Sequence, residues 1–180
     1  MVSRREFLTA FRRKEQRSFF APYNLKRSLF YENCVHCAEE EMVKPCVLAC
    51  NAVYNKENGG VLYFNENCIE IDFSAKGCLL CGECAKFCPS DVLDKALAQE
   101  KNPNWSFTID ISISNCLAHQ KILCNTCKDI CYSVLGRENA IEFQGLFYPE
   151  IKESCIGCGE CVSKCPTQAI FLLEKERNES

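Results

Sequence analysis

The sequence predicts an α+β fold made of two similar cysteine-rich modules in tandem, preceded by a basic N-terminal arm. Three observations lead to this prediction. Sixteen of the 17 cysteines fall into four groups of four, the order of the groups repeats along the chain, and short strand-like stretches lie between them. At 180 residues with 17 cysteines, the chain has room for two small domains but only a thin ordinary apolar core. Domains of this kind are usually held together by disulfides or metal.

Two of the four groups share one regular spacing, Cys-x2-Cys-x2-Cys-x3-Cys-Pro. Bacterial ferredoxins hold cubane [4Fe–4S] clusters with this spacing. The sequence therefore predicts bacterial-type 2[4Fe-4S] ferredoxin-like modules. The regular groups consist of Cys78, Cys81, Cys84 and Cys88 before Pro89, and of Cys155, Cys158, Cys161 and Cys165 before Pro166.

An irregular group of four cysteines precedes each regular one. The regular groups begin 77 residues apart, and the irregular groups end 81 residues apart, so the order irregular, regular occurs twice. We expect the basic arm at residues 1–30, the first module at 31–95 and the second at 104–172. The irregular groups consist of Cys34, Cys37, Cys46 and Cys50, and of Cys116, Cys124, Cys127 and Cys131.

Disulfides and zinc are the competing interpretations of so many cysteines. Cysteines two residues apart make poor disulfide partners, and an odd total leaves one thiol unpaired. Zinc prefers two Cys-x2-Cys pairs separated by a longer loop, which does not suit the triple step of the regular groups. Zinc stays open as an alternative for the Cys34–Cys50 group.

The ligand sets are expected to cross between groups. In paired-cluster ferredoxins the first three cysteines of one group bind together with the last cysteine of the partner group. All sixteen grouped cysteines are then used, in four [4Fe-4S] clusters. The expected sets are Cys34, Cys37, Cys46 and Cys88 (cluster 1), Cys78, Cys81, Cys84 and Cys50 (cluster 2), Cys116, Cys124, Cys127 and Cys165 (cluster 3), and Cys155, Cys158, Cys161 and Cys131 (cluster 4).

Three residues near the groups have no assigned ligand role. Cys68 is left over, and we interpret it as a buried structural cysteine. His36 and His119 stand next to grouped cysteines, and with four cysteines in each set neither is required as a ligand.

Short strands and helical turns are expected between and within the groups. The stretches Val61–Phe64 and Ile69–Phe73 can form a hairpin, and Ile141–Tyr148 can pair with the residues around Ile151. Trp105–Ile113 alternates apolar and polar residues, as a half-buried strand does. A helical turn is expected within each regular group. The segment Asp91–Pro103 is helical or linker-like and marks the boundary between the modules.

The first 27 residues carry eight basic and two acidic side chains, a net charge of +6, which leaves −9 for the rest of the chain. Such a basic segment is either an interaction tail or a solvated terminus. Its start, Ser3-Arg4-Arg5-Glu6-Phe7-Leu8, is similar to a twin-arginine export motif. A signal peptide also needs an apolar stretch, and Arg12-Arg13-Lys14 interrupts it here. We therefore expect a cytoplasmic protein without a transmembrane segment.

No motif of a catalytic or nucleotide-binding site occurs in the chain. It lacks Gly-x-Gly-x-x-Gly after a strand, a Walker loop and His-Glu-x-x-His. A pI of about 5.5 argues against a nucleic-acid partner. The sequence thus predicts an electron-transfer or accessory protein, with no catalytic residues of its own.

The segment Trp105–Cys131 is the most specific part of the sequence. It combines an aromatic strand with Cys116-Leu117-Ala118-His119-Gln120 and then the x7, x2 and x3 spacing of the second irregular group. Together with the N-terminal Ser3–Leu8 motif, it resembles the ferredoxin-type NapF family of the periplasmic nitrate reductase system. The resemblance extends from Ser3 to about Ile170. The eight residues between Cys37 and Cys46 depart from the family's compact first group.

The resemblance implies a cytoplasmic iron–sulfur accessory protein. It would bind the precursor of the nitrate reductase catalytic subunit and aid its maturation before twin-arginine export, through redox-active [4Fe-4S] clusters. Two alternatives stay open. The chain can be a polyferredoxin that carries electrons between a membrane quinol-oxidising iron–sulfur complex and a reductase, or a scaffold whose clusters are purely structural.

Overall fold

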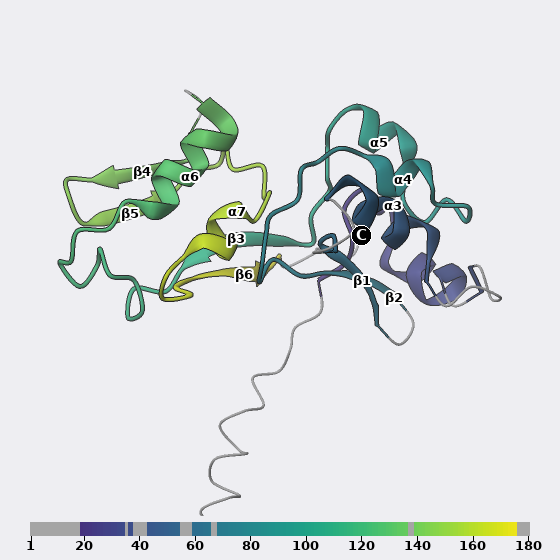
Figure 1. Cartoon of the computed structure of the whole chain (residues 1–180), viewed down its shortest axis with the longest axis horizontal. Coiled ribbons are helices and arrows are strands. Elements are labelled where there is room, and N and C mark those ends of the chain that lie inside the picture. The colour runs from purple at the N-terminus through teal and green to yellow at the C-terminus, as the bar shows by residue number, and fades with distance from the viewer. Residues whose placement is uncertain are drawn as a thin grey trace, which may run out of the picture.

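The computed structural model describes residues 19–34, 36–37, 43–54, 59–65, 68–136 and 139–175 (Figure 1). The twin-arginine-like motif and the basic residues up to Arg17 lie outside this range. The helices are α2 (Arg27–Leu29), α3 (Pro45–Val53), α4 (Glu83–Lys86), α5 (Lys95–Gln99), α6 (Thr126–Leu135) and α7 (Glu160–Lys164), with a π-helix, η1, at Phe30–Cys34. The strands are β1 (Leu62–Asn65), β2 (Cys68–Ile71), β3 (Phe107–Ile111), β4 (Ile141–Gln144), β5 (Tyr148–Ile151) and β6 (Ile170–Glu174). A mixed α and β fold is therefore confirmed.

The first half of the molecule, residues 19–103, is built around the β1–β2 hairpin. The strands pair antiparallel, with Leu62 opposite Ile71, which confirms the predicted hairpin. All four residues of β2 are buried. Residues 19–21 run along the outer edge of β2, where the Ala21 N–H donates to the Ile69 carbonyl at 3.0 Å.

Residues 19–24 pack into this core, although we expected residues up to 30 to belong to the arm. Phe20 is 2% exposed and Tyr23 is fully buried. The Tyr23 N–H donates to the Pro103 carbonyl at 2.7 Å. This short segment therefore ties the start of the described chain to the end of the first half.

The segment Asp91–Pro103 is packed rather than free. Val92 and Leu93 are buried, and helix α5 follows them. The Asp94 carboxylate caps this helix by accepting from the Leu97 N–H at 2.7 Å. The segment belongs to the first half, and the chain crosses to the second half after it.

The second half, residues 104–175, contains two antiparallel strand pairs. The predicted strand within Trp105–Ile113 is confirmed as β3, with Phe107 and Ile109 buried in alternation. It pairs with β6, and the predicted β4–β5 hairpin is also confirmed, with Ile141 opposite Ile151. Helix α7 leads into β6, while α6 and the β4–β5 hairpin lie at the end of the second half away from the first half (Figure 1).

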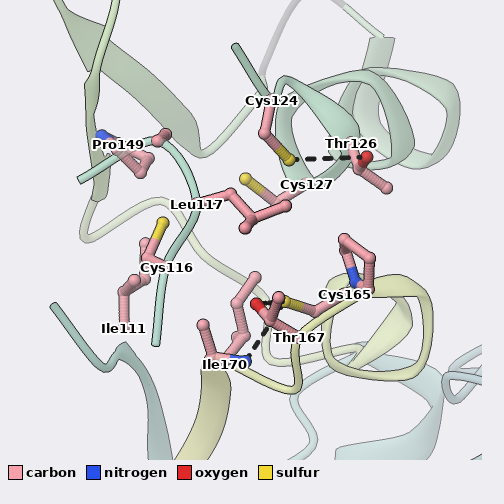
Figure 2. A pocket seen from close by; sticks show the side chains of 13 residues that line it. Ile111, Cys116, Leu117, Cys124, Thr126, Cys127, Pro149, Cys165, Thr167 and Ile170 are labelled. Carbon is pink, nitrogen blue, oxygen red and sulfur yellow. Dashed lines mark hydrogen bonds between the residues drawn. The ribbon is translucent and has the colours of Figure 1, made fainter. Parts of the chain in front are cut away.

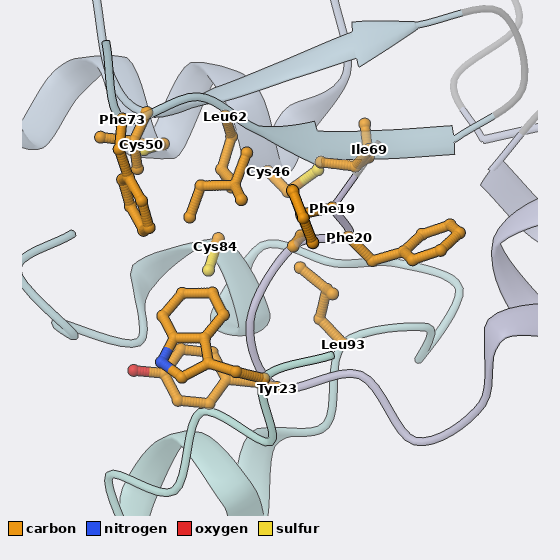
Figure 3. Close-up of a cluster of buried hydrophobic side chains, with 14 of the residues drawn as sticks. Phe19, Phe20, Tyr23, Cys46, Cys50, Leu62, Ile69, Phe73, Cys84 and Leu93 are labelled. Atoms are coloured by element: carbon orange, nitrogen blue, oxygen red, sulfur yellow. The ribbon is translucent and has the colours of Figure 1, made fainter. Parts of the chain in front are cut away.

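An aromatic contact joins the two halves. The ring of Phe73, from the first half, lies edge-on to Trp105 and Phe107 of the second half, with centroids 6.1 and 5.9 Å apart. The ring of Phe19 meets Phe107 at 5.3 Å. Figure 3 shows the adjoining core of the first half, in which the thiols of Cys46, Cys50 and Cys84 lie among buried apolar side chains.

Candidate metal centres

The two regular groups fold in the same way. In each, the sequence Cys-Gly-Glu-Cys places a glycine before a short helix, Gly82 before α4 and Gly159 before α7, with φ of 75° and 77°. Glycine adopts this left-handed conformation at little cost. The helix then carries the third cysteine of the group, Cys84 or Cys161, into a buried position.

A second left-handed residue shapes the loop between the first two cysteines of each regular group. It is Leu80 in the first half, with φ of 52°, and Gly157 in the second, with φ of 69°. The Leu80 N–H points back to the Cys78 sulfur at 3.4 Å. Hydrogen bonds of this kind favour the charged thiolate, which is the form that binds metal. At Cys78 the effect of burial exceeds that of this hydrogen bond and raises the pKa to about 12. The Gly157 N–H lowers the pKa of Cys155 in the same way, and burial again exceeds this effect.

One pocket of the second half is lined by four cysteines from three segments (Figure 2). The Cys116 thiol comes from the loop before α6, and Cys127 is part of that helix. Burial and, to a smaller extent, the charges of the nearby Cys124 and Cys116 thiols raise the pKa of Cys127 to about 12. The four lining cysteines are the thiols expected to hold cluster 3, namely Cys116, Cys124, Cys127 and Cys165.

The thiols expected to hold cluster 4 also lie close together. Burial raises the pKa of Cys161, and the charges of Cys158, Cys155, Cys127 and Cys131 raise it further. All but Cys127 belong to the expected set.

A similar arrangement brings the expected cluster 1 thiols together. Burial and, to a smaller extent, the charges of Cys88, Cys34 and Cys37 raise the pKa of Cys46 to about 12. Cys88 ends the regular group, and the other three begin the irregular group. The fold thus brings the last thiol of one group next to the first three of the other.

The complementary crossing occurs at the expected cluster 2 thiols. Burial raises the pKa of Cys84, with further contributions from Cys78, Cys50, Cys46 and Cys81. Cys50 is the last cysteine of the irregular group, yet it lies among thiols of the regular group. The structure therefore brings together the members of all four expected sets, and their role as ligands stays a prediction.

A close backbone approach at Gly60 supports the position of Cys50. A Cβ atom at Gly60 would lie 2.5 Å from the Cys50 sulfur, closer than real contacts allow. The N–H groups of Val61 and Leu62 lower the pKa of Cys50 against the larger effect of burial, which raises it. Sequence analysis did not identify Gly60 as part of the site, because its contact with Cys50 depends on the fold.

Cys165 differs from the other thiols whose pKa is shifted. Burial acts to raise its pKa, but hydrogen bonds from the backbone at Thr167, Ala169 and Ile170 exceed this effect, so the pKa is lowered overall. The Ala169 N–H lies 3.2 Å from the sulfur. The backbone after the regular group is therefore arranged to stabilise a thiolate at Cys165.

The chemistry of these sets fits iron–sulfur clusters. Soft thiolate ligands favour iron–sulfur, zinc or copper(I) sites. Among the residues that the structure describes, no three His, Cys, Asp or Glu side chains come close enough to hold a single metal ion. A [4Fe–4S] cluster places its four thiolates on four different irons, so it needs thiols around a shared space rather than at one point.

Sequence reasoning missed a buried lysine beside the first set. The Lys44 side chain is 7% exposed, its ammonium group donates to the Cys37 carbonyl, and it lies 4.7 Å from the centre of the Phe64 ring. Only its position between Cys37 and Cys46 could have drawn attention to it. Lys44 places a positive charge next to thiols that carry negative charge when they bind metal.

Cys68, His36 and His119 were given no ligand role. Cys68 is buried, and its thiol lies 3.4 Å from the Glu70 carboxylate. The His119 ring packs edge-on against Tyr148, with centroids 5.7 Å apart. His36 is exposed, one residue before Cys37.

In the described part of the chain, no helix has the length and apolar character needed to cross a membrane.

A scan against protein families matches residues 148–171, which include the second regular group, to the 4Fe-4S binding domain. No solved structure matches the chain. The ferredoxin-type protein NapG of Haemophilus influenzae is 26% identical over 154 residues, and that of Escherichia coli is 25% identical over 161. These alignments cover 76% and 80% of this chain, but only 50% and 64% of the NapG proteins.

The ferredoxin-type protein NapF of Haemophilus influenzae is 32% identical over an alignment of 135 residues, and this alignment covers 57% of this chain and 73% of that protein. The resemblance to the NapF family is thereby confirmed. Because the identity extends over most of the relative's length, the chain belongs to the NapF family of ferredoxin-type proteins.

Proposed function

We propose that this protein is a cytoplasmic iron–sulfur accessory protein that helps to mature the catalytic subunit of a periplasmic nitrate reductase before its twin-arginine export. The observation that carries the proposal is the 32% identity with the NapF relative. Its partner would be the precursor of that catalytic subunit. The chain would act on this partner through redox-active [4Fe–4S] clusters.

The proposal assigns the sixteen grouped cysteines as cluster ligands in two tandem modules. The crossed neighbours support it, since Cys88 lies with the first irregular group and Cys50 with the first regular group. Burial also supports it. A buried thiolate without a counter-charge is unfavourable, and iron provides that charge.

Electron transfer suits these sites better than catalysis on a bound substrate. Each [4Fe–4S] cluster exchanges one electron, and its potential depends on hydrogen bonds to sulfur and on burial. The backbone N–H groups near Cys78 and Cys165 provide such hydrogen bonds. A set of four centres can therefore supply reducing equivalents to a partner during its maturation.

A second candidate function is electron delivery to a mature reductase, with a membrane quinol-oxidising iron–sulfur complex as donor. The NapG relatives, whose alignments cover up to 80% of this chain, are ferredoxin-type proteins, and this description favours an electron carrier. Both functions use the same cysteines, and they differ in when the electrons are needed. Maturation needs them before the reductase becomes active, whereas delivery needs them at every turnover.

A strain without this protein separates the two functions. Its periplasmic nitrate reductase is assayed first with a reduced dye, which bypasses physiological electron delivery, and then with quinol. Loss of dye-driven activity supports maturation. Normal dye-driven activity with loss of quinol-driven activity supports delivery, and normal activity in both assays contradicts both functions.

Complementation adds a matched control. The strain receives either the unchanged chain or a Cys78→Ser, Cys155→Ser variant that removes one ligand from each regular group. If the clusters act by redox chemistry, the variant fails to restore the activity that the unchanged chain restores. A redox titration of the purified protein tests the scaffold alternative, since centres that never change oxidation state would support a purely structural role.

A further inference from the structure

We propose that the contact between residues 77–78 and residues 158–160, here called the junction, is the path by which electrons pass between the two halves of the molecule. The four thiol sets would then form one series rather than two separate pairs. This inference rests on the proposed cluster ligands. It adds the order in which they are connected.

The junction joins two expected ligand cysteines through their backbones. The Cys78 N–H donates to the Cys158 carbonyl at 2.6 Å, and the Gly77 N–H donates to the Glu160 carboxylate. Cys78 belongs to the first half and Cys158 to the second. Two peptide groups that carry ligands are therefore in direct hydrogen-bond contact across the boundary between the halves.

The close approach explains why a glycine stands at position 77. A Cβ atom there would lie 2.5 Å from the Glu160 nitrogen and 2.6 Å from the Cys158 oxygen. The equivalent position in the second regular group, directly before Cys155, is Ser154. Since the same loop accepts serine there, the loop itself does not need glycine. The contact between the halves requires it.

Aromatic side chains fix the junction from both sides. A Cβ atom at Gly159 would overlap the ring of Phe73, and one at Gly157 would lie 2.5 Å from the Trp105 ring nitrogen. That nitrogen donates to the Ile156 carbonyl at 2.8 Å. The second regular loop is thus held between a ring from each half. The distance between the two regular groups is therefore set by packing.

The thiol neighbours within each half complete the series. In the first half, Cys46 of the first set and Cys50 of the second set lie one turn apart on helix α3. In the second half, Cys127 of the third set and Cys131 of the fourth set lie one turn apart on helix α6. The series then runs from the first set through the second and the fourth to the third. The two sets at its ends each take three of their four thiols from an irregular group.

Each step along this series is balanced. One electron leaves a reduced centre and enters an oxidised one, so the donor centre is oxidised as the acceptor is reduced. No bond is made or broken, and no proton is required. An electron accepted near Cys34 can leave near Cys116.

The test uses the full chain, purified without oxygen with its iron, and pulsed electron paramagnetic resonance of the reduced protein. A reference variant, Cys155→Ser with Cys161→Ser, removes the fourth set. In the unchanged protein, the spin relaxation of the first-half centres is expected to be several-fold faster than in this reference. The Gly77→Ala variant is expected to keep its iron and the fourth-set signal, yet to relax as slowly as the reference.

Two internal controls come from the repeat. Ser154→Ala changes the residue equivalent to Gly77. Glu83→Ala changes the residue equivalent to Glu160; unlike Glu160, Glu83 pairs with Lys86 on its own helix. Both controls are expected to relax like the unchanged protein. If Gly77→Ala loses iron, Glu160→Ala gives the same test, because it removes the carboxylate without adding a clash. The single tryptophan, Trp105, reports opening of the junction through its fluorescence.

The proposal is overturned if removal of the fourth set leaves the relaxation of the first-half centres unchanged. It is also overturned if the junction opens, as Trp105 reports, in an iron-replete variant whose relaxation stays fast. A low iron content in the unchanged protein would instead contradict the proposed ligands. The two failures are therefore distinguishable.

Discussion

Lys44 is buried beside Cys34, and its positive charge opposes the effects that make a thiolate at Cys34 unfavourable. Burial, followed by the charges of Cys88 and Cys37, raises the pKa of Cys34 to about 12, and Lys44 acts in the opposite direction. A cluster bound by four thiolates gains negative charge on reduction. A nearby positive charge stabilises the reduced form more than the oxidised one.

Replacement of Lys44 by methionine is therefore expected to lower the reduction potential of one centre by tens of millivolts. Methionine keeps much of the apolar stem that lies over Phe64 while removing the charge. An anaerobic redox titration followed by electron paramagnetic resonance measures the shift. Lys95→Met is the control, because Lys95 is exposed on α5 and pairs with Asp91. Equal potentials in both variants would contradict the role of Lys44.

Double substitutions test the crossed ligand sets. Cys34→Ser with Cys88→Ser removes two ligands of one expected cluster, so about twelve of about sixteen irons should remain. Cys78→Ser with Cys88→Ser removes one ligand from each of two clusters, so about eight should remain. Iron and sulfide analysis of the anaerobic proteins gives the counts. The opposite ranking would mean that each group binds its own cluster, and about twelve irons with one zinc in the unchanged chain would indicate zinc at the Cys34–Cys50 group.

Substitution of Cys68 is expected to leave the iron content unchanged. Cys68→Ser keeps a donor near the Glu70 carboxylate, whereas Cys68→Ala removes it. We expect the alanine variant to be less stable than the serine variant by about 1 kcal/mol, as measured by denaturant unfolding. Loss of about four irons in either variant would make Cys68 a ligand and would revise the sets.

The metal-free chain should lose stability at alkaline pH. Burial raises the pKa of Cys34 and Cys46 from 9.0 to about 12, so the folded state keeps protons that the unfolded state loses. This contribution to stability is fully present below pH 9 and is lost as the pH rises to about 12. Circular dichroism across this range measures it. In the iron-bound protein the same thiols carry metal instead of protons, so its structure should change less between these values.

Local sequence patterns predicted those parts of the fold that depend on neighbouring residues. The spacing of the regular groups indicated the loop and helical turn at Gly82 and Gly159, and alternation indicated the hairpins and β3. These features depend on backbone preference and a two-residue period, both of which can be read within a short window.

The contacts that sequence analysis missed join residues far apart in the chain. The partner of β3 is β6, with Phe107 opposite Glu174, and nothing near either strand indicates the other. The need for glycine at position 77 arises from Glu160, 83 residues away. Such contacts depend on how the halves pack, and a single sequence does not contain that information in any local pattern.

The crossing of thiols between groups also bears on how the protein is made. Cys34, Cys37 and Cys46 leave the ribosome well before Cys88, the fourth thiol of their expected set. If these are the ligands, the first site would stay incomplete until the chain has been synthesised past Pro89, and the expected set of Cys116 would stay incomplete until Cys165 emerges. Cofactor insertion would then follow synthesis one half at a time, and a truncated chain would be left with exposed, oxidation-prone thiols.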